Sequence, residues 1–62
     1  MKNIWDSFEL YLIVLGARSL DYSYTPEMIF EHIDYFKRCW ESRISCYYAL
    51  EAFSFELEEE NK

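Results

Sequence analysis

Glycine and proline, the residues that most often interrupt helices, each occur only once in this chain of 62 residues, at Gly16 and Pro26. Neither occurs between residues 27 and 60, so the usual helix stop signals are missing from that stretch. The sequence also lacks a pair of strand-like segments. Only the run at 10–14 combines apolar and β-branched residues, and an isolated strand would leave both of its edges unpaired. We therefore predict an all-α fold, with a strand at 10–14 as the alternative.

Motifs that accompany catalysis or metal binding are absent from the sequence. It contains no nucleophile elbow, phosphate-binding loop, glycine-rich dinucleotide turn or metalloprotease motif. The single histidine, His32, and the two cysteines, Cys39 and Cys46, are separated by seven-residue steps, each of which spans about 10 Å along a helix. That spacing is too wide for one metal ion, or for a disulfide between two cysteines of the same helix. We therefore expect no catalytic residue, no metal site and no cofactor.

Long apolar runs and an excess of basic residues are lacking as well. The apolar run at 10–15 is shorter than the roughly 20 residues that span a bilayer, and the first residues do not resemble a signal peptide. We expect a cytoplasmic protein that does not contact a membrane. With 12 acidic and 6 basic residues the net charge is −6, and acidic residues flank the cationic group of Lys37, Arg38 and Arg43. Because such a chain repels nucleic acid, we expect no direct nucleic-acid binding.

The clearest positive feature is a helix start at Thr25-Pro26-Glu27. Thr25 can accept a hydrogen bond from a free backbone amide, Pro26 fits the first helical position, and Glu27 is favoured at the positive end of the helix dipole. Apolar residues then recur at spacings of three and four, at Ile29, Ile33, Phe36, Trp40, Ile44, Tyr47 and Leu50. This spacing predicts one continuous helix from Pro26 to about Leu57.

The predicted long helix has more apolar surface than one neighbouring helix can cover. Its apolar arc spans roughly 200°, against the roughly 100° of a simple surface helix. Charged and polar residues nevertheless lie near the middle of the arc, at Arg43, Glu51, Ser54 and Glu58, and beyond Tyr47 the apolar residues move to its flanks. A mixture of aromatic and charged residues is more typical of an interface than of an interior.

A shorter amphipathic segment precedes the long helix. Asn3 can cap a first helix from Ile4 to about Ala17, and Gly16 can either end this helix or ease its last turn. Residues 21–25 have the length of a connector between two helices. We therefore predict a single helical domain over residues 1–62, built as a helical hairpin with a short first helix and a long second helix. Residues 56–62 form an acidic tail that we expect to fray, because glutamates meet the unfavourable end of the helix dipole there.

The surplus of apolar surface favours self-association of this hairpin. The chain is 52% hydrophobic and 21% aromatic, and a chain this short is marginally stable alone. We therefore expect a homodimer that forms a helical bundle, with the two chains either parallel or antiparallel. The layout is similar to that of small plasmid-encoded helical-hairpin dimers of the Rop type. No motif is shared with them, so RNA binding is not carried over.

These features together favour protein binding over catalysis. Our main hypothesis is a small interaction protein that binds a larger protein and inhibits or modulates it, of the kind encoded by bacteriophages and mobile elements. Two alternatives stay open: a mimic of nucleic-acid phosphates that blocks a DNA-binding protein, and a purely structural subunit of a helical oligomer.

The candidate contact residues are aromatic residues of the kind that anchor interfaces, together with carboxylates of the acidic tail. They are Tyr22, Tyr24, Trp40, Tyr47, Tyr48, Phe53, Phe55, Glu56, Glu58 and Glu59. For the two tyrosines of the connector, Tyr22 and Tyr24, the sequence is equally consistent with a hydrophobic plug that folds back on the start of the long helix.

Overall fold

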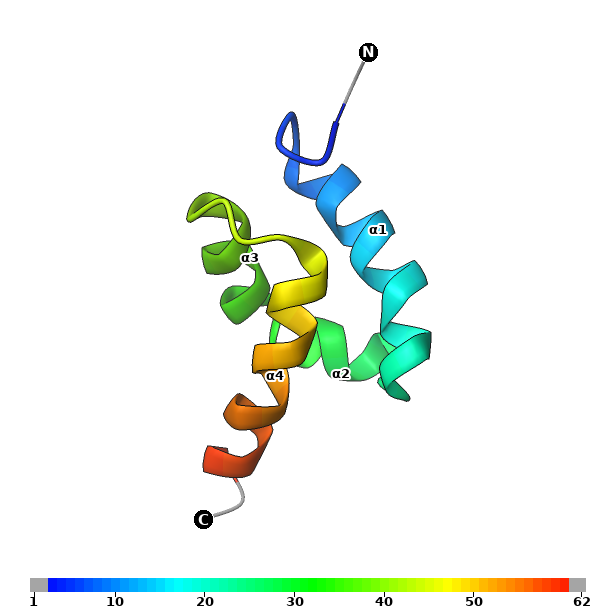
Figure 1. Ribbon diagram of the computed structural model, residues 1–62, viewed down its shortest axis with the longest axis vertical. Coiled ribbons are helices and arrows are strands. Elements are labelled where there is room, and N and C mark those ends of the chain that lie inside the picture. The colour runs from blue at the N-terminus through cyan, green and yellow to red at the C-terminus, as the bar shows by residue number, and fades with distance from the viewer. Residues whose placement is uncertain (1–2, 61–62) are drawn as a thin grey trace.

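The computed structural model describes residues 3–60, and within them it contains four α-helices, one 3₁₀ turn and no strand. The helices are α1 at Phe8–Ser19, α2 at Pro26–Glu31, α3 at Ile33–Glu41 and α4 at Cys46–Glu60, and the 3₁₀ turn η1 spans Leu20–Tyr22. In the view of Figure 1 the chain descends along α1, crosses through α2, rises along α3 and descends again along α4. The all-α prediction is confirmed for these residues, and the alternative strand at 10–14 lies within α1.

The first helix begins at Phe8 rather than at Ile4. Ser7, not Asn3, is its cap, because Ser7 Oγ accepts a hydrogen bond from the Leu10 amide at 3.3 Å. Asn3 instead closes a separate turn, in which its Oδ1 accepts from the Trp5 amide at 2.8 Å. The helix also continues through Gly16 to Ser19, so Gly16 does not end it and lies in its last turn, as in the second of the two interpretations.

The predicted helix start at Thr25 is confirmed, but the single long helix is wrong. Thr25 Oγ1 accepts from the Met28 amide at 3.3 Å, and Pro26 takes the first helical position. The first break lies at His32, whose backbone leaves helical geometry with φ −115° and ψ 32°. Its ring atom Nδ1 lies 2.9 Å from the Met28 carbonyl oxygen. Because a carbonyl can only accept, Nδ1 is the donor, and it satisfies one of the free carbonyls at the end of α2.

The connector between α1 and α2 closes through a left-handed residue, Ser23, with φ 62°. The amides of Ser23 and Tyr24 donate to the carbonyls of Leu20 and Ser19, at 3.2 and 3.1 Å. This pair of hydrogen bonds is the Schellman pattern, in which glycine usually occupies the left-handed position. The first helical segment therefore ends with serine at the position where glycine is usual.

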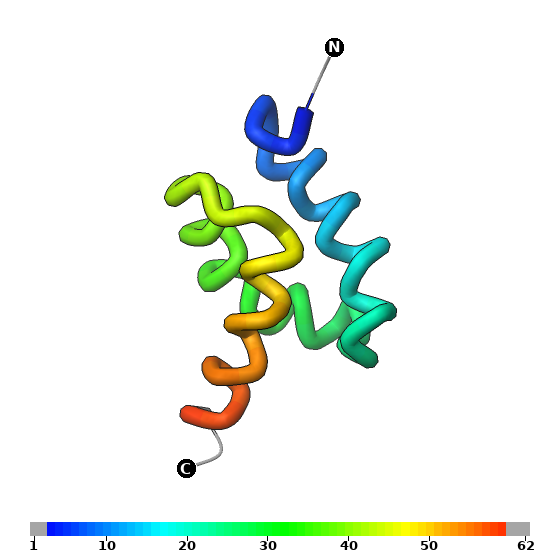
Figure 2. The backbone as a smooth tube through the Cα atoms, in the orientation of Figure 1, coloured from blue at the N-terminus to red at the C-terminus, as the bar shows by residue number. Residues whose placement is uncertain are grey.

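The second break in the predicted long helix, between α3 and α4, has the same geometry. Arg43 is left-handed, with φ 60°. The amides of Arg43 and Ile44 donate to the carbonyls of Trp40 and Cys39, at 3.1 and 2.9 Å, which again is the Schellman pattern. Figure 2 shows the backbone reversing direction at this point, so that α4 runs back alongside the rest of the molecule.

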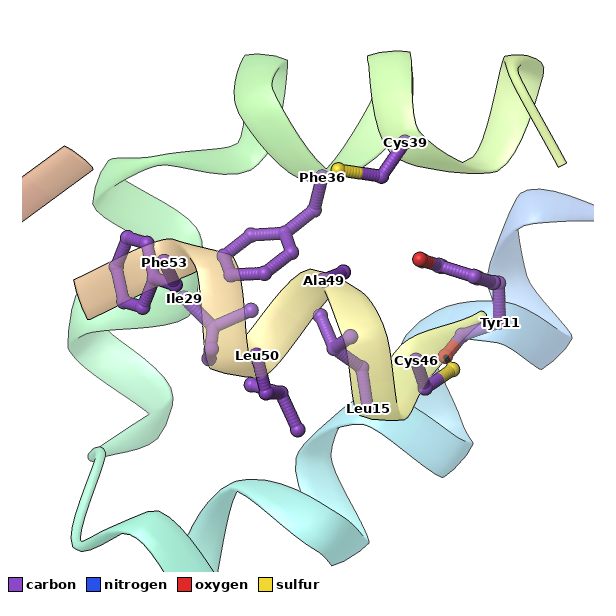
Figure 3. Close-up of a cluster of buried hydrophobic side chains, with 9 residues drawn as sticks. All are labelled: Tyr11, Leu15, Ile29, Phe36, Cys39, Cys46, Ala49, Leu50 and Phe53. Atoms are coloured by element: carbon purple, nitrogen blue, oxygen red, sulfur yellow. Dashed lines mark hydrogen bonds between the residues drawn. The ribbon is translucent and has the colours of Figure 1, made fainter. Parts of the chain in front are cut away.

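The core is made by side chains from all four helices, with α4 at its centre. The buried hydrophobic residues are Tyr11 and Leu15 of α1, Ile29 of α2, Phe36 and Cys39 of α3, and Cys46, Ala49, Leu50 and Phe53 of α4. Figure 3 shows α4 passing between α3 and α1, with these side chains filling the space between the helices. The rings of Phe36 and Phe53, for example, have their centroids 4.9 Å apart.

Polar atoms of large aromatic side chains connect distant parts of the chain. The Tyr11 hydroxyl donates to the Ile44 carbonyl at 2.9 Å, and the Trp40 indole N–H donates to the Ile4 carbonyl at 3.0 Å. Among the side chains of residues 3–59, no buried nitrogen or oxygen lacks a hydrogen-bond partner. The aromatic rings can therefore pack inside while their polar ends remain bonded.

The last helix extends further than predicted, through Glu60 instead of ending near Leu57. Fraying of the acidic tail at 56–62 stays a prediction, and its last two residues lie outside the described part of the chain. None of the helices within residues 3–60 combines the length and the apolarity needed to cross a membrane.

Candidate protein-binding surface

The start of α4 determines which of its residues face the core. Ser45 Oγ accepts a hydrogen bond from the Tyr48 amide at 3.2 Å and caps the helix. Because the break at Arg43 resets the helical register, the buried positions are those of Cys46, Ala49, Leu50 and Phe53. The predicted apolar stripe, which placed Tyr47 in line with Leu50, is therefore wrong at Tyr47, whose side chain is 55% exposed.

The opposite side of α4 exposes three aromatic residues. Tyr47, Tyr48 and Phe55 are 55%, 65% and 68% exposed. Successive residues of a helix lie 100° apart around its axis. Phe55 follows Cys46 by nine positions, so it lies on the opposite side of α4 from this buried residue, at the middle of the exposed side. We call this surface the α4 outer face, and define it by Tyr47, Tyr48, Glu51, Ala52, Phe55, Glu56, Glu58 and Glu59. Large apolar side chains exposed together are typical of interaction sites.

A hollow of about 290 Å³ lies beside Phe55, between α4 and Tyr35 of α3. It is lined by Tyr35, Ala52, Phe55, Glu56 and Glu59, so its wall is aromatic and apolar with two carboxylates. Tyr35 is fixed in place because its hydroxyl donates to the Ala49 carbonyl at 3.3 Å. Burial raises the pKa of Tyr35, so its hydroxyl stays protonated and keeps this donor role.

Negative charge is concentrated along the same helix. Residues 46–60 contain glutamate at 51, 56, 58, 59 and 60 and no lysine or arginine. Glu58 and Glu59 are exposed and Glu56 is half-buried. The last turn of α4 has no basic residue, so these carboxylates add to the negative end of the helix dipole. Hydrogen bonding to the Glu51 carboxylate, together with its charge, raises the pKa of Tyr47 above the usual value.

The N-terminal end of the outer face has a different chemistry. A second hollow, of about 390 Å³, is lined by Arg43, Ile44, Ser45 and Tyr48. The Arg43 guanidinium lies 5.4 Å from the centroid of the Trp5 ring, within the range of a cation–π contact. A cation therefore lies just before the N-terminal end of the outer face and carboxylates lie at its C-terminal end, with exposed aromatic rings between them.

The two tyrosines of the connector stack on each other but contact different surfaces. The ring centroids of Tyr22 and Tyr24 are 6.0 Å apart, with an interplanar angle of 6°. Tyr24 meets Phe53 edge-on at 5.1 Å, so it covers the core, as in the plug interpretation. Tyr22 lies 6.3 Å from Tyr47 and thereby adjoins the α4 outer face.

Besides Tyr24, two more of the predicted contact residues, Phe53 and Trp40, pack within the fold. Phe53 has no exposed surface, and its ring lies within 4.9–5.8 Å of the rings of Tyr24, His32, Tyr35 and Phe36. Trp40 is half-buried; its ring lies 5.5 Å from that of Phe8, and its N–H is bonded to the N-terminal turn. Neither side chain is part of the α4 outer face, and we leave both out of the candidate surface.

An apolar groove between α1 and α2 was not predicted from the sequence. It has a volume of about 260 Å³ and is lined by Leu12, Ile13, Gly16, Ala17, Pro26, Ile29 and Phe30, none of which carries a charge. Ile13 and Phe30 are 61% and 68% exposed. The sequence has no direct signal for this groove, because the groove depends on α2 ending after 6 residues.

The two cysteines, whose thiols are the most reactive groups of the chain, lie in the core. Cys39 and Cys46 are free and only 5% and 3% exposed. Burial raises the pKa of both thiols, that of Cys46 to about 11. The Cys46 thiol donates to the Tyr11 carbonyl at 3.5 Å. Within the described residues, no group of three or more His, Cys, Asp or Glu side chains is arranged to hold a metal ion.

The α4 outer face is suited to surface recognition, because it is an exposed aromatic surface on a helix whose other side is fixed in the core. No protein-family model, curated protein or solved structure matches the chain.

Proposed function

We propose that the chain is a small protein-interaction module that binds a larger protein through the α4 outer face and inhibits or modulates it. Proteins with this role are often small products of bacteriophages and mobile elements, and we assign the chain to that type. The proposal is based mainly on Phe55, whose side chain is 68% exposed on the side of α4 that faces away from the core. The free, buried thiols of Cys39 and Cys46 fit a reducing compartment, so the proposal sets this binding in the cytoplasm.

The energetics of the outer face support this role. Covering an aromatic side chain of this size gains about 1.5–3 kcal/mol relative to leaving it in water. Phe55 projects from a helix held by Leu50 and Phe53 in the core, so little ordering of the backbone is required when a partner binds. Tyr47 and Tyr48 add two further amphipathic rings, a residue type that is frequent at the energetic centres of interfaces.

The arrangement of charges favours an aromatic-anchored interface over the nucleic-acid mimic. A mimic depends on carboxylates alone, whereas the carboxylates of α4 alternate with Tyr48 and Phe55 along the helix. The two functions differ in their dependence on salt, because exposed charge pairs are screened while apolar burial is not. Binding that disappears when salt is raised, and that is insensitive to Phe55→Ala, would favour the mimic.

We also propose that a second copy of the chain packs on the α1–α2 groove and forms a helical bundle. Two copies with a net charge of −6 each repel one another, so they can meet most favourably where the contact surface has no carboxylate. The lining of this groove has none. Sedimentation over a range of protein concentrations tests the dimer. Phe30→Ala should shift the chain towards the monomer, and Phe55→Ala should leave its mass unchanged.

The proposed function is tested by affinity capture from bacterial lysate with a matched pair of variants. Phe55 and Phe30 are both phenylalanines, both are 68% exposed, and they lie on different helices. The wild type and Phe30→Ala should recover the same larger protein in a stoichiometric complex, and Phe55→Ala should recover much less of it. If no stoichiometric partner is recovered, or if the two variants recover equal amounts, the proposal is wrong.

A further inference from the structure

The hollow beside Phe55 combines two chemistries that one type of side chain can satisfy. Its wall is made by Tyr35, Ala52 and Phe55, and its edge by Glu56 and Glu59. Lysine and arginine have an apolar stem with a cationic head, so the stem can lie on the aromatic wall while the head reaches the carboxylates. Arginine fits best, because its planar guanidinium stacks on aromatic rings and pairs with carboxylates through two parallel hydrogen bonds.

Among the residues that the structure describes, no lysine or arginine lines this hollow. Residues 46–60 have no lysine or arginine, and the nearby helix α3 carries Lys37 and Arg38 outside the lining. The Arg38 Nε donates instead to the Asp34 carbonyl, at 3.4 Å. The carboxylates also lie at the negative end of α4, where each adds to the unfavourable interaction with the helix dipole. A cation from a partner would relieve this repulsion.

We infer that the partner segment that docks on the α4 outer face is a basic amphipathic helix, with an arginine in the hollow formed by Tyr35, Phe55, Glu56 and Glu59. This inference rests on the proposed function and specifies the chemistry of its partner. The basic residues of the segment lie over the C-terminal half of α4. Its apolar residues cover Phe55 and Tyr48, and its neutral or acidic end lies over the hollow that contains Arg43.

The polarity of the surface also sets the direction of the docked helix. The N-terminal end of any helix is positive and its C-terminal end is negative. The C-terminal end of α4 carries Glu56, Glu58 and Glu59, and Arg43 lies just before its N-terminal end. Antiparallel docking places the positive end of the partner helix against these glutamates, so it is favoured over parallel docking.

The test uses three synthetic peptides labelled with a fluorophore. The first is an amphipathic peptide of leucine and arginine at helical spacing. The second has glutamate in place of every arginine, and the third has the composition of the first in a scrambled order without an apolar face. Binding is measured by fluorescence anisotropy against the wild-type chain, against Glu56→Gln/Glu59→Gln, and against Phe55→Ala. Glu9→Gln/Glu27→Gln is the matched control, because both carboxylates are exposed but lie on α1 and α2.

We expect only the first peptide to bind. Glu56→Gln/Glu59→Gln and Phe55→Ala should each weaken it by about tenfold or more, since two charged contacts or one aromatic anchor are lost. The control should change its affinity by less than about twofold. Circular dichroism of each variant checks that the helical fold is kept, as expected for exposed and half-buried positions.

Four results would overturn the inference: no binding of the arginine peptide, equal binding of the glutamate peptide, equal binding of the scrambled peptide, or equal weakening by the control substitutions. Failure of the peptide test is distinguishable from failure of the proposed function. If lysate capture still depends on Phe55 while the arginine peptide does not bind, the basic partner is wrong and the proposed function stands. If capture does not depend on Phe55, the proposed function itself fails.

Discussion

Two phenylalanines that are only two positions apart on α4 should respond to substitution in opposite ways. Phe53 has no exposed surface, whereas Phe55 is 68% exposed. Phe53 lies at the centre of an aromatic cluster with Tyr24 at 5.1 Å and Phe36 at 4.9 Å between ring centroids. Phe53→Ala removes these contacts and leaves a cavity, which typically costs about 3–5 kcal/mol.

That loss is comparable to the whole stability of so short a chain. At about 0.05–0.15 kcal/mol per residue, 62 residues give a free energy of unfolding of roughly 3–9 kcal/mol. Phe53→Ala should therefore lose about a third or more of the stability, and it should be unfolded at 25 °C if the wild type lies in the lower half of this range. Phe53→Leu keeps most of the apolar volume, so it should lose roughly 1–2 kcal/mol and remain folded, which makes the effect measurable.

Phe55→Ala should leave stability almost unchanged. It removes no core contact, and alanine has a higher helix propensity than phenylalanine, so we expect a change within about 0.5 kcal/mol. Urea unfolding followed by far-ultraviolet circular dichroism gives all three values on one scale. If Phe55→Ala destabilises the chain as much as Phe53→Leu, then the register of α4 is wrong and its outer face is not free to bind a partner.

Three further predictions test the local structure. Ser23→Gly should raise the free energy of unfolding by about 0.5–1 kcal/mol, because glycine adopts the left-handed geometry of this position without strain. The control Ser42→Gly, at φ −88°, should lower the free energy of unfolding. If both substitutions lower it, the left-handed geometry of Ser23 is contradicted. Ser45→Ala should cost about 1 kcal/mol through loss of the α4 cap, and no change in urea unfolding would contradict that cap. Burial raises the pKa of Cys46 from 9.0 to about 11, so the stability that it contributes is complete below pH 9 and is lost as the pH rises to 11. The slope is about 1.4 kcal/mol per pH unit, and Cys46→Ala should flatten the alkaline part of the stability curve; an unchanged curve would refute this.

The sequence predicts those parts of the fold that depend on local chemistry. The start at Thr25 and Pro26 follows from capping and from the fixed geometry of proline, and it is present in the structure. The all-α class follows from the spacing of apolar residues and the lack of pairing strands. Ile29, Phe36 and Leu50, which the helical spacing placed on one apolar stripe, are all buried.

The breaks in the long helix were missed because they use residues that are not typical helix breakers. The first break lies at His32, and the second at Arg43, which adopts a left-handed geometry that costs an L-residue about 1–2 kcal/mol. Long-range core packing can offset this cost, but the local sequence does not reveal it. One signal was present: Arg43 falls near the middle of the apolar arc of a continuous helix. The break at Arg43 removes this conflict, since α4 then restarts with a register that buries Phe53.

The candidate surface stays a prediction, but the structure separates its exposed residues from those in the core. Tyr47, Tyr48, Phe55, Glu58 and Glu59 are exposed on α4, whereas Phe53 is buried. Phe53 was assigned to the same set because aromatic residues occur in both cores and interfaces. Only the rotation of α4 about its axis decides which of these aromatic residues face the core and which face solvent. The α1–α2 groove with Phe30 depends on how two helices pack, and no local pattern specifies it.

The most direct test of the proposed binding surface is photo-cross-linking in cells from two equivalent positions. A photoreactive phenylalanine analogue is placed at Phe55 in one experiment and at Phe30 in the other, since both side chains are 68% exposed. We predict that position 55 gives a covalent adduct with one larger protein, and that position 30 gives a product with the mass of two chains. A larger-protein adduct from position 30 with none from position 55 would contradict the assignment of the α4 outer face as the binding surface.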